Sequence, residues 1–153
     1  MDKKTCLEEQ TIFDIVSHSP EETLEAGRQL APYAQPPCLV LLEGDLGSGK
    51  TTLAKGIVSG LGAAREEDVT SPSFTLVHEY GEDPRVYHAD LYRVEDAPGL
   101  ATLGLDELMG QRATVLIEWG ERLGRDLPLP RVEVHLEYLS YEERRLTARR
   151  LSG

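Results

Sequence analysis

Residues 44–51 read GDLGSGKT and match the phosphate-binding pattern G-x-x-x-x-G-K-[ST] at every fixed position. In this pattern the glycines let backbone N–H groups close around the phosphates of a nucleotide. Lys50 is expected to contact the β- and γ-phosphates, and the hydroxyl of Thr51 is a ligand for Mg²⁺. The alternative is a glycine-rich turn that matches by chance, and the flanking segments decide between the two.

These flanking segments have the character of a strand and a helix. Cys38–Leu42 is a short apolar run typical of a buried strand, and Thr51–Val58 has helical character. A strand, a glycine loop and a helix in this order are the context that a phosphate-binding loop requires. The helix also places the positive end of its dipole at the phosphates. We therefore predict one phosphate-loop unit over residues 38–61.

Two acidic residues are candidates for the chemistry that accompanies such a loop. Glu118 follows the apolar run 113–117, and Asp90 ends the strand-like segment 85–90. Phosphoryl-transfer sites need an acidic group at a strand end to hold Mg²⁺ directly or through water. Open α/β sheets place ligands at the carboxyl ends of their strands. An exposed carboxylate at a strand end is the alternative for each residue.

Three further features have both a functional and a structural interpretation. His88 and Asp90 share one face of a strand, as in some metal sites, but without further His or Cys ligands a buried, hydrogen-bonded histidine is favoured. Trp119, the only tryptophan, is typical of a large packing group, but its place directly after Glu118 puts it near the nucleotide if Glu118 binds there. The hydroxyl-rich segment 70–75 resembles a loop that senses a γ-phosphate, and equally a serine-rich turn.

The remaining chain alternates strand-like and helical segments. Ser19 and Pro20, followed by two glutamates, form a helix start, and Pro32, Pro36 and Pro37 end that helix at about residue 30 or 33. Strands are predicted over 11–16, 76–80, 85–90, 113–117 and 132–138, and a helix over 98–108. Residues 144–151 are expected to pair with 132–138 as an edge strand.

Length and charge restrict the classes of function. A chain of 153 residues fits one domain, and we expect residues 1–153 to form a single phosphate-loop domain. The net charge of −11 argues against a general nucleic-acid-binding surface, because phosphate backbones require clustered lysine and arginine. We interpret the one basic cluster as the solvated face of a terminal strand, and it consists of Arg144, Arg145, Arg149 and Arg150.

The cysteines and the N-terminus bear on the cellular location. Cys6 and Cys38 lack the C-x-x-C spacing of a zinc or redox site, and two isolated thiols indicate no disulfide framework. The N-terminus has no apolar core of a signal peptide, and no apolar run approaches membrane-spanning length. The expected location is therefore the reducing cytoplasm, without a membrane partner.

The order of four motifs resembles the TsaE family, formerly called YjeE. The motifs are GDLGSGKTT at 44–52, TSPSFTLVHEY at 70–80, YHADLYR at 87–93 and IEWGER at 117–122. Members of this family are small bacterial ATPases required for making threonylcarbamoyladenosine in tRNA. The resemblance implies an α/β, P-loop NTPase-like three-layer fold with a mixed parallel and antiparallel sheet. It also implies ATP or ADP with Mg²⁺ as cofactors, TsaB and TsaD as partners, and tRNA reached only through their complex.

The resemblance also assigns roles to individual residues. It makes Thr51 and Glu118 the magnesium ligands. It places Asp90 near the γ-phosphate as a residue essential for turnover, and Lys50 is the second catalytic candidate. Trp119 matches the tryptophan of the family's E-W pair. Phosphate contacts are implied for Gly47, Ser48, Gly49, Lys50, Thr51 and Thr52, and a switch-like role for Ser71, Pro72, Ser73 and Thr75.

Two parts of the nucleotide site are less defined by the resemblance. Ser19–Thr23 resembles the family's helix start beside the adenine, as a loose match. An arginine of the C-terminal strands is expected near the nucleotide, and the sequence does not separate Arg144 from Arg145.

Two other functions are compatible with a phosphate loop. A kinase for a small metabolite normally adds an acceptor-binding segment and an arginine-bearing lid, whereas residues 62–112 are typical of a loop, a hairpin and one helix. A GTP-dependent switch normally carries an N-K-x-D motif, and this sequence contains no asparagine. Asp96–Gly99 mimics D-x-x-G but does not follow a buried strand. A partner-activated ATPase is therefore the favoured function.

Overall fold

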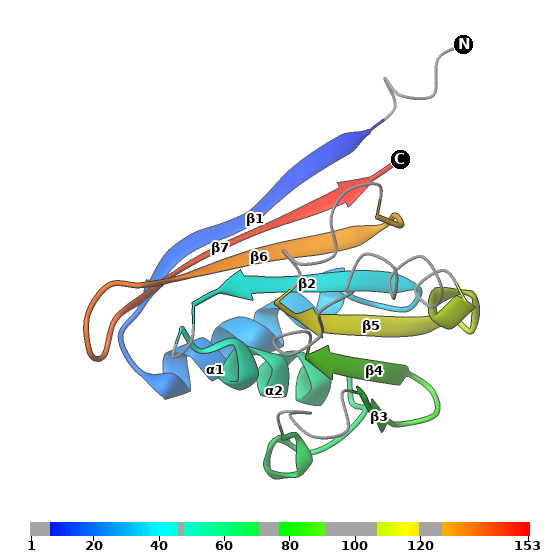
Figure 1. The fold of residues 1–153 in the computed structure, drawn as a ribbon, viewed down its shortest axis with the longest axis horizontal. Coiled ribbons are helices and arrows are strands. Elements are labelled where there is room, and N and C mark those ends of the chain that lie inside the picture. The colour runs from blue at the N-terminus through cyan, green and yellow to red at the C-terminus, as the bar shows by residue number, and fades with distance from the viewer. Residues whose placement is uncertain (1–6, 46–47, 71–76, 91–106, 120–126) are drawn as a thin grey trace.

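The computed structural model describes residues 7–45, 48–70, 77–90, 107–119 and 127–153, and Figure 1 shows their arrangement. In chain order the elements are β1 (Glu8–Ser17), α1 (Pro20–Leu30), the 3₁₀ turn η2 (Ala31–Tyr33), β2 (Cys38–Gly44), α2 (Lys50–Gly60), the 3₁₀ turn η3 (Glu66–Asp68), β3 (Val77–Tyr80), β4 (Arg85–Asp90), β5 (Ala113–Glu118), β6 (Arg131–Tyr138) and β7 (Arg144–Ser152).

The seven strands form one sheet in the order β1-β7-β6-β2-β5-β4-β3. At its centre, β2 pairs in parallel with β5 on one side and with β6 on the other. Beyond β5, β4 extends the parallel part, while β3, β7 and β1 run antiparallel to their neighbours. In Figure 1 the arrowheads of β2, β4 and β5 point the same way. The predicted α/β fold with a mixed sheet is therefore confirmed.

The strand predicted over 144–151 is not an edge strand, which corrects the expectation from the sequence. On one side β7 pairs with β6, and on the other it pairs with β1, from Glu8 opposite Ser152 to Ser17 opposite Arg144. The edges are β1 and β3. The alternation of apolar and polar side chains identifies a strand but does not indicate which distant strand will pair with it. The pairing of β7 with β1 could therefore not be predicted from the sequence.

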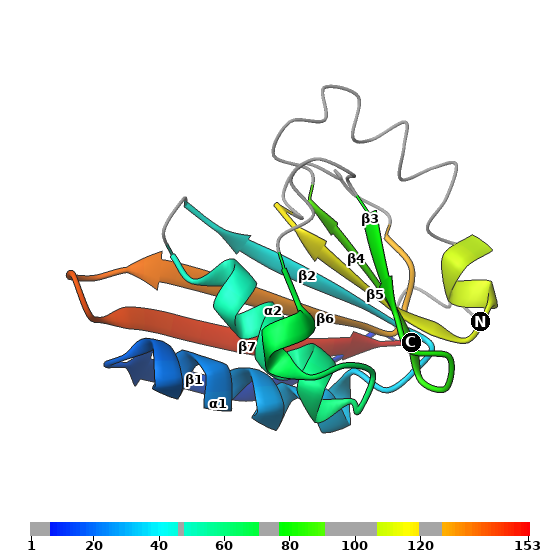
Figure 2. The same ribbon diagram turned by 90° about the horizontal axis from the view of Figure 1, so that it is seen from below.

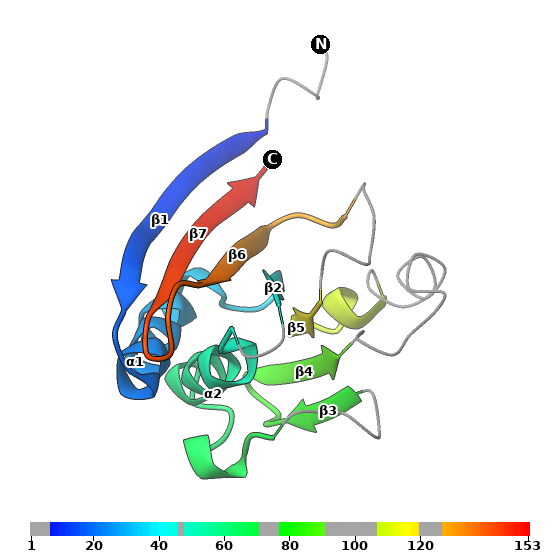
Figure 3. The same cartoon turned by 60° about the vertical axis from the view of Figure 1, so that its left-hand side comes forward.

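Both helices of the described residues cover the same face of the sheet, as Figures 2 and 3 show. The start of α1 is the predicted one, because Ser19 is its N-cap and the Ser19 side chain accepts a hydrogen bond from the Glu22 N–H. On the opposite face, the described part of the chain has one helical turn at residues 107–110. Most of the helix predicted over 98–108 lies outside the described residues.

Apolar side chains form a core on each face of the sheet. Val40 and Leu42 of β2 pack against α1 and α2, whereas Leu39 and Leu41 of the same strand pack with β4, β5 and the turn at 107–110. Successive side chains of a strand point to opposite faces, so a strand covered on both faces is apolar throughout. This double burial fixes β2 as the central support of the loop that follows it.

The predicted strands are otherwise confirmed, within a few residues at their ends, by β1, β3, β4, β5 and β6. Residue 76, at the start of one prediction, lies outside the described residues. Among the helices that the structure describes, none combines the length and the apolar character needed to cross a membrane.

The two helices approach each other closely at glycines. A Cβ atom at Gly56 of α2 would lie 2.1 Å from the Leu24 carbonyl oxygen and 2.9 Å from the Cα of Gly27. A Cβ atom at Gly27 of α1 would lie 2.4 Å from the carbonyl oxygen of Leu53. These distances are far below van der Waals contact, so only glycines allow the helices to pack this closely.

Replacing Gly56 with alanine will destabilise the protein, because the new Cβ meets backbone atoms that no side-chain rotation moves. We expect the free energy of unfolding to fall by about 1–3 kcal/mol, the usual cost of overpacking. Gly110→Ala is the matched control, since its Cβ position meets no atom of a described residue within 4 Å other than its own chain neighbours and helix backbone. Urea denaturation measures both variants, and equal stability of Gly56→Ala and the parent chain would contradict the tight helix contact.

Candidate phosphate and metal site

Three strand ends converge at one edge of the sheet. The phosphate-loop pattern begins at Gly44, the last residue of β2, and Glu118 and Asp90 end β5 and β4. Asp90 is the register partner of Glu118, which is in turn the partner of Leu42. The structure therefore brings together the loop and both predicted carboxylates, at the edge where parallel sheets bind ligands.

The described part of the loop has a backbone that glycine adopts readily. Gly44 and Gly49 have φ angles of 154° and 101°, which residues with a Cβ atom rarely adopt. A Cβ atom at Gly44 would also lie 2.5 Å from the carbonyl oxygen of Leu136. Between the two glycines, the Ser48 N–H donates a hydrogen bond to the Asp45 carbonyl (3.1 Å). This bond curls the chain back on itself, as a phosphate cradle requires.

The start of α2 offers donors to an anion. Gly49 is the N-cap, and no described side chain caps the helix, so the first N–H groups of the helix point toward the loop. The Ser48 hydroxyl is buried and has no hydrogen-bond partner among the described residues. A buried polar atom of this kind suits an added ligand oxygen. Gly47, also predicted to contact phosphate, lies outside the described residues.

The charged end of Lys50 is held within the loop. Its Nζ donates hydrogen bonds to the carbonyls of Gly44 (2.5 Å) and Asp45 (2.9 Å), and it lies 4.0 Å from the centre of the Trp119 ring. Lys50 is only 5% exposed, so these contacts take the place of water around the ammonium. The cation is thereby fixed where the sequence pattern predicts contact with phosphates.

Trp119 contacts the loop residue Lys50 in addition to packing in the core. Its φ angle is 65°, an unusual backbone conformation for a bulky residue, and such strain is common at functional sites. The Trp119 N–H donates to the Leu42 carbonyl (2.9 Å), which ties the residue after β5 to β2. With the backbone held in this way, the ring lies over the Lys50 ammonium.

The structure also places the two predicted magnesium ligands in contact. The Thr51 hydroxyl oxygen lies 3.1 Å and 3.2 Å from the two carboxylate oxygens of Glu118, and Glu118 is 3% exposed. Mg²⁺ prefers oxygen ligands and is usually bound through one or two carboxylates together with substrate phosphates. These residues therefore fit a Mg²⁺ ion that is bound with a nucleotide.

A second group, the His88 ring, contacts the Glu118 carboxylate. His88 Nε2 lies 2.7 Å from Glu118 Oε2, and the ring is fully buried. The predicted buried, hydrogen-bonded histidine is confirmed, but reasoning from the sequence missed its partner. The two residues are 30 positions apart, and only the placement of β4 beside β5 brings them together. The spacing of His88 and Asp90 predicted only that these two residues share one face of the strand, and it did not point to Glu118.

Asp90 is half-buried at the end of β4. Because alternate residues share a face, its side chain projects to the same side of the sheet as His88. The predicted switch residues Ser71, Pro72, Ser73 and Thr75 lie outside the described residues. The structure does show how the start of that segment is anchored, because the Thr70 N–H donates to the Tyr80 hydroxyl (3.3 Å).

The basic cluster of β7 divides between the two faces of the sheet, which corrects the prediction of a single solvated face. Arg145 and Arg149 lie on the face opposite the helices. Arg145 donates to both carboxylate oxygens of Asp14 on β1, at 3.0 Å and 2.8 Å. The hydrogen bond from Arg145 lowers the pKa of Asp14. Arg145 is therefore engaged away from the loop.

Arg144 and Arg150 lie on the helix side, because they alternate with Arg145 and Arg149 along the strand. The Arg144 guanidinium lies 4.4 Å from the centre of the Tyr138 ring. Tyr138 is the register partner of Arg144 and follows Leu136, which is the partner of Gly44. Arg144 therefore lies beyond the end of β2, on the side of the sheet that carries α2.

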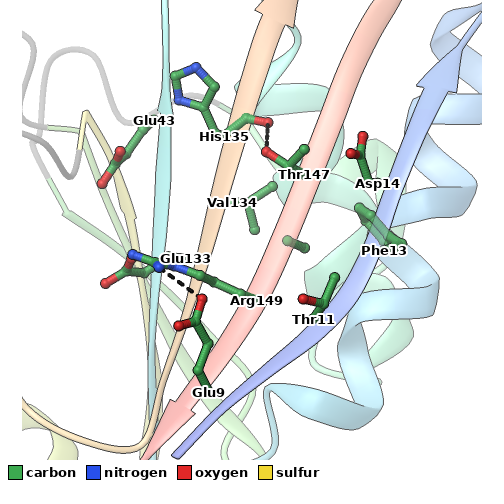
Figure 4. A pocket seen from close by; sticks show the side chains of 11 residues that line it. Glu9, Thr11, Phe13, Asp14, Glu43, Glu133, Val134, His135, Thr147 and Arg149 are labelled. Atoms are coloured by element: carbon green, nitrogen blue, oxygen red, sulfur yellow. Dashed lines mark hydrogen bonds and ion pairs between the residues drawn. The ribbon is translucent and has the colours of Figure 1, made fainter.

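A hollow of about 310 Å³ lies over β1, β7, β6 and the end of β2, and Figure 4 shows its lining. Arg149 crosses it and forms ion pairs with Glu9 (2.9 Å) and Glu133 (2.6 Å). The lining includes Glu43, next to the loop, but none of the predicted phosphate contacts that the structure describes. This hollow is therefore separate from the phosphate and metal site.

Residues 17–147 match the family model for threonylcarbamoyl adenosine biosynthesis protein TsaE. The chain belongs to the TsaE family. The tRNA threonylcarbamoyladenosine biosynthesis protein TsaE of Bacillus subtilis is 39% identical over 130 residues, which cover 84% of this chain and 80% of that protein. The protein of the same name from Treponema pallidum is 34% identical over 132 residues, which cover 86% of this chain and 96% of that protein.

The fold of this TsaE-family chain is also found in a solved structure. The crystal structure of Bacillus subtilis YdiB aligns with a TM-score of 0.70 and 33% identity, over 94% of this chain and 86% of that one. The match to the TsaE family model includes the phosphate loop, Asp90 and Glu118. The family predicted from the four motifs is therefore confirmed.

We predict that replacing Lys50 with alanine will weaken the binding of ADP, because it removes the cation at the predicted phosphate site. A hydrogen bond to a charged group contributes about 1.5–3 kcal/mol, so we expect the dissociation constant to rise roughly 10- to 100-fold. Lys55→Ala removes the same charge further along α2 and is the matched control. Isothermal titration calorimetry measures both, and an unchanged ADP affinity of Lys50→Ala would exclude the assigned contact.

Proposed function

We propose that this chain is a Mg²⁺-dependent ATPase in the biosynthesis of threonylcarbamoyladenosine in tRNA, with residues 1–153 as one domain. The contact between Thr51 and Glu118 carries the proposal, because a hydroxyl and an acidic group hold Mg²⁺ beside the phosphates in phosphate-loop enzymes. The names of the relatives from Bacillus subtilis and Treponema pallidum support the pathway.

The loop from Gly47 to Thr52 is assigned to the phosphates of ATP or ADP. The buried Lys50 ammonium, the Ser48 hydroxyl and the start of α2 support this assignment. Mg²⁺ held by Thr51 and Glu118 would neutralise charge on the phosphate oxygens. Trp119 fixes one side of Lys50 and keeps its ammonium directed at the loop.

Asp90 is assigned to the hydrolysis step, with Lys50 as the second catalytic residue. Asp90 is the neighbour of Glu118 in the sheet register but is more exposed. Asp90 is less enclosed than Glu118, the proposed metal ligand. Its carboxylate is therefore suited to orient the attacking water at the γ-phosphate. Glu118 and Asp90 therefore take different roles, one in metal binding and one in turnover.

Arg144, not Arg145, is the arginine assigned to the nucleotide. Arg145 binds Asp14 on the opposite face, whereas Arg144 and the Tyr138 ring lie on the side of α2. Thr23 of α1 lies on this side too, because its methyl group is 3.6 Å from the Cβ position of Gly49. An aromatic ring and a guanidinium plane are groups on which a nucleobase stacks.

TsaB and TsaD are assigned as the partners through the family resemblance. The net charge of −11 supports contact with tRNA through that complex and not directly. In the described part of the site, one buried ammonium accompanies two carboxylates. Phosphoryl transfer depends on positive charge around the γ-phosphate, and a cation supplied by a partner contributes about 10³–10⁵ in rate in related switch proteins. We therefore assign slow hydrolysis to the isolated chain.

Glu118→Gln and Asp90→Asn will separate metal binding from turnover. We expect Glu118→Gln to lose most of the Mg²⁺-dependent gain in nucleotide affinity, because it removes the charge of the metal ligand. Asp90→Asn is expected to bind Mg²⁺ and ATP normally and to lose about 10²–10⁴ in kcat, the usual share of acid–base catalysis. Titration calorimetry with and without Mg²⁺, combined with phosphate release, measures both. The opposite pattern would exchange the two roles.

The proposed function is tested by single-turnover phosphate release from ATP in the presence and absence of the purified TsaB–TsaD pair. We expect slow release from the isolated chain and a rate increase of about 10³ or more with the pair, because a partner completes the charge around the γ-phosphate. Lys50→Ala with the pair is the control for contaminating ATPases. Equal rates with and without the pair would rule out partner activation.

A further inference from the structure

We infer that His88 is a positioning residue that holds the Glu118 carboxylate in the orientation that meets Thr51. The inference rests on the proposed function, in which Glu118 is a metal ligand. His88 contacts Oε2 of Glu118 from β4 at 2.7 Å, and the Thr51 hydroxyl reaches both carboxylate oxygens from α2. The carboxylate is therefore fixed between two elements that approach it from different directions.

Burial makes this hydrogen bond necessary. His88 is 0% and Glu118 is 3% exposed, so water does not solvate either group. A buried carboxylate keeps its charge only where hydrogen-bond donors replace that water. A glutamate side chain also has several rotamers, and a donor on a neighbouring strand selects one of them. Metal-binding carboxylates are commonly held by a second layer of donors in this way.

The surroundings of the imidazole ring indicate which nitrogen donates. A carboxylate only accepts hydrogen bonds, so Nε2 of His88 carries the proton. The other nitrogen, Nδ1, is buried and has no partner among the described residues. Nδ1 lacks a described partner in either tautomer, so the contact with Glu118 decides between them. A proton moved from Nε2 to Nδ1 would remove the donor from Glu118, and this loss favours the Nε2–H tautomer.

The strand that carries His88 is held on both sides. His88 is the register partner of His78 on β3 and of Leu116 on β5. A ring attached to a strand paired at both edges has little freedom to follow a displaced carboxylate. We therefore expect His88 to set the position of Glu118, and the site for the metal to be formed before the metal binds.

Two substitutions that differ only in the reach of an amide test the inference. The amide nitrogen of His88→Gln occupies the place of Nε2, whereas that of His88→Asn reaches only the place of Nδ1. We expect His88→Asn to weaken Mn²⁺ binding in the presence of ADP by roughly 10- to 100-fold, with an unchanged ADP affinity in EDTA. His88→Gln is expected to keep most of the parent affinity for Mn²⁺. Electron paramagnetic resonance of Mn²⁺ and calorimetry with ADP measure these affinities.

The outcomes distinguish this inference from the proposed function. Unchanged Mn²⁺ affinity in His88→Asn would overturn the inference and leave the metal role of Glu118 intact. An equal loss of ADP affinity in EDTA would also overturn it, because the residue would then support the fold as a whole. If the parent chain bound ADP with no dependence on Mn²⁺, the metal site itself would fail, and the inference with it.

A measurement on the unsubstituted chain applies even where a core variant fails to fold. Long-range ¹H–¹⁵N correlation spectra report which nitrogen of each histidine ring carries a proton. We expect His88, assigned through its backbone connectivities, to be protonated at Nε2 both without ligand and with Mg²⁺ and ADP. A His88 ring protonated at Nδ1 alone would overturn the inference.

Discussion

The buried carboxylate of Glu118 is the constraint on which the site depends. Moving a carboxylate out of water costs on the order of several kcal/mol, so a buried glutamate persists only where donors surround it. Among the described residues the donors come from two elements, the Thr51 hydroxyl of α2 and the His88 ring of β4. The placement of β5 between β4 and β2 is therefore required, and so is the packing of α2 on the face toward which Glu118 points.

The position of α2 depends in turn on backbone contacts that exclude side chains. Gly27 and Gly56 let the two helices approach until backbone meets backbone, and Gly44 lets the loop leave β2 directly beside the carbonyl of Leu136. A helix moved outward by the width of one methyl group would separate Thr51 from Glu118. The absence of side chains at a few glycines thus sets the distance between Thr51 and Glu118, although none of these glycines is a proposed metal ligand.

Local signals in the sequence predicted most of the elements and the residue types of the site, whereas contacts between distant segments were not predictable. The Ser19 cap and the apolar run of β2 follow from neighbouring residues, and α1 and β2 formed where expected. The order of the strands leaves no trace in the alternation of side chains, so neither the partnership of β7 with β1 nor that of His88 with Glu118 was predicted. The positive φ of Trp119 and its contact with Lys50 had no signal at all.

The strands β6, β7 and β1 depend on the same helices as the proposed metal ligands, Thr51 and Glu118. Their outer face carries exposed ion pairs such as Arg145 with Asp14, and such pairs contribute little to stability. Their inner face packs Leu146 and Ala148 into the core beneath α1 and α2, and burial of apolar area contributes far more. The helices therefore support both Thr51 and the strand that carries Arg144. A displacement of the helices would therefore move the proposed metal ligand Thr51 and the proposed nucleotide-binding Arg144 together.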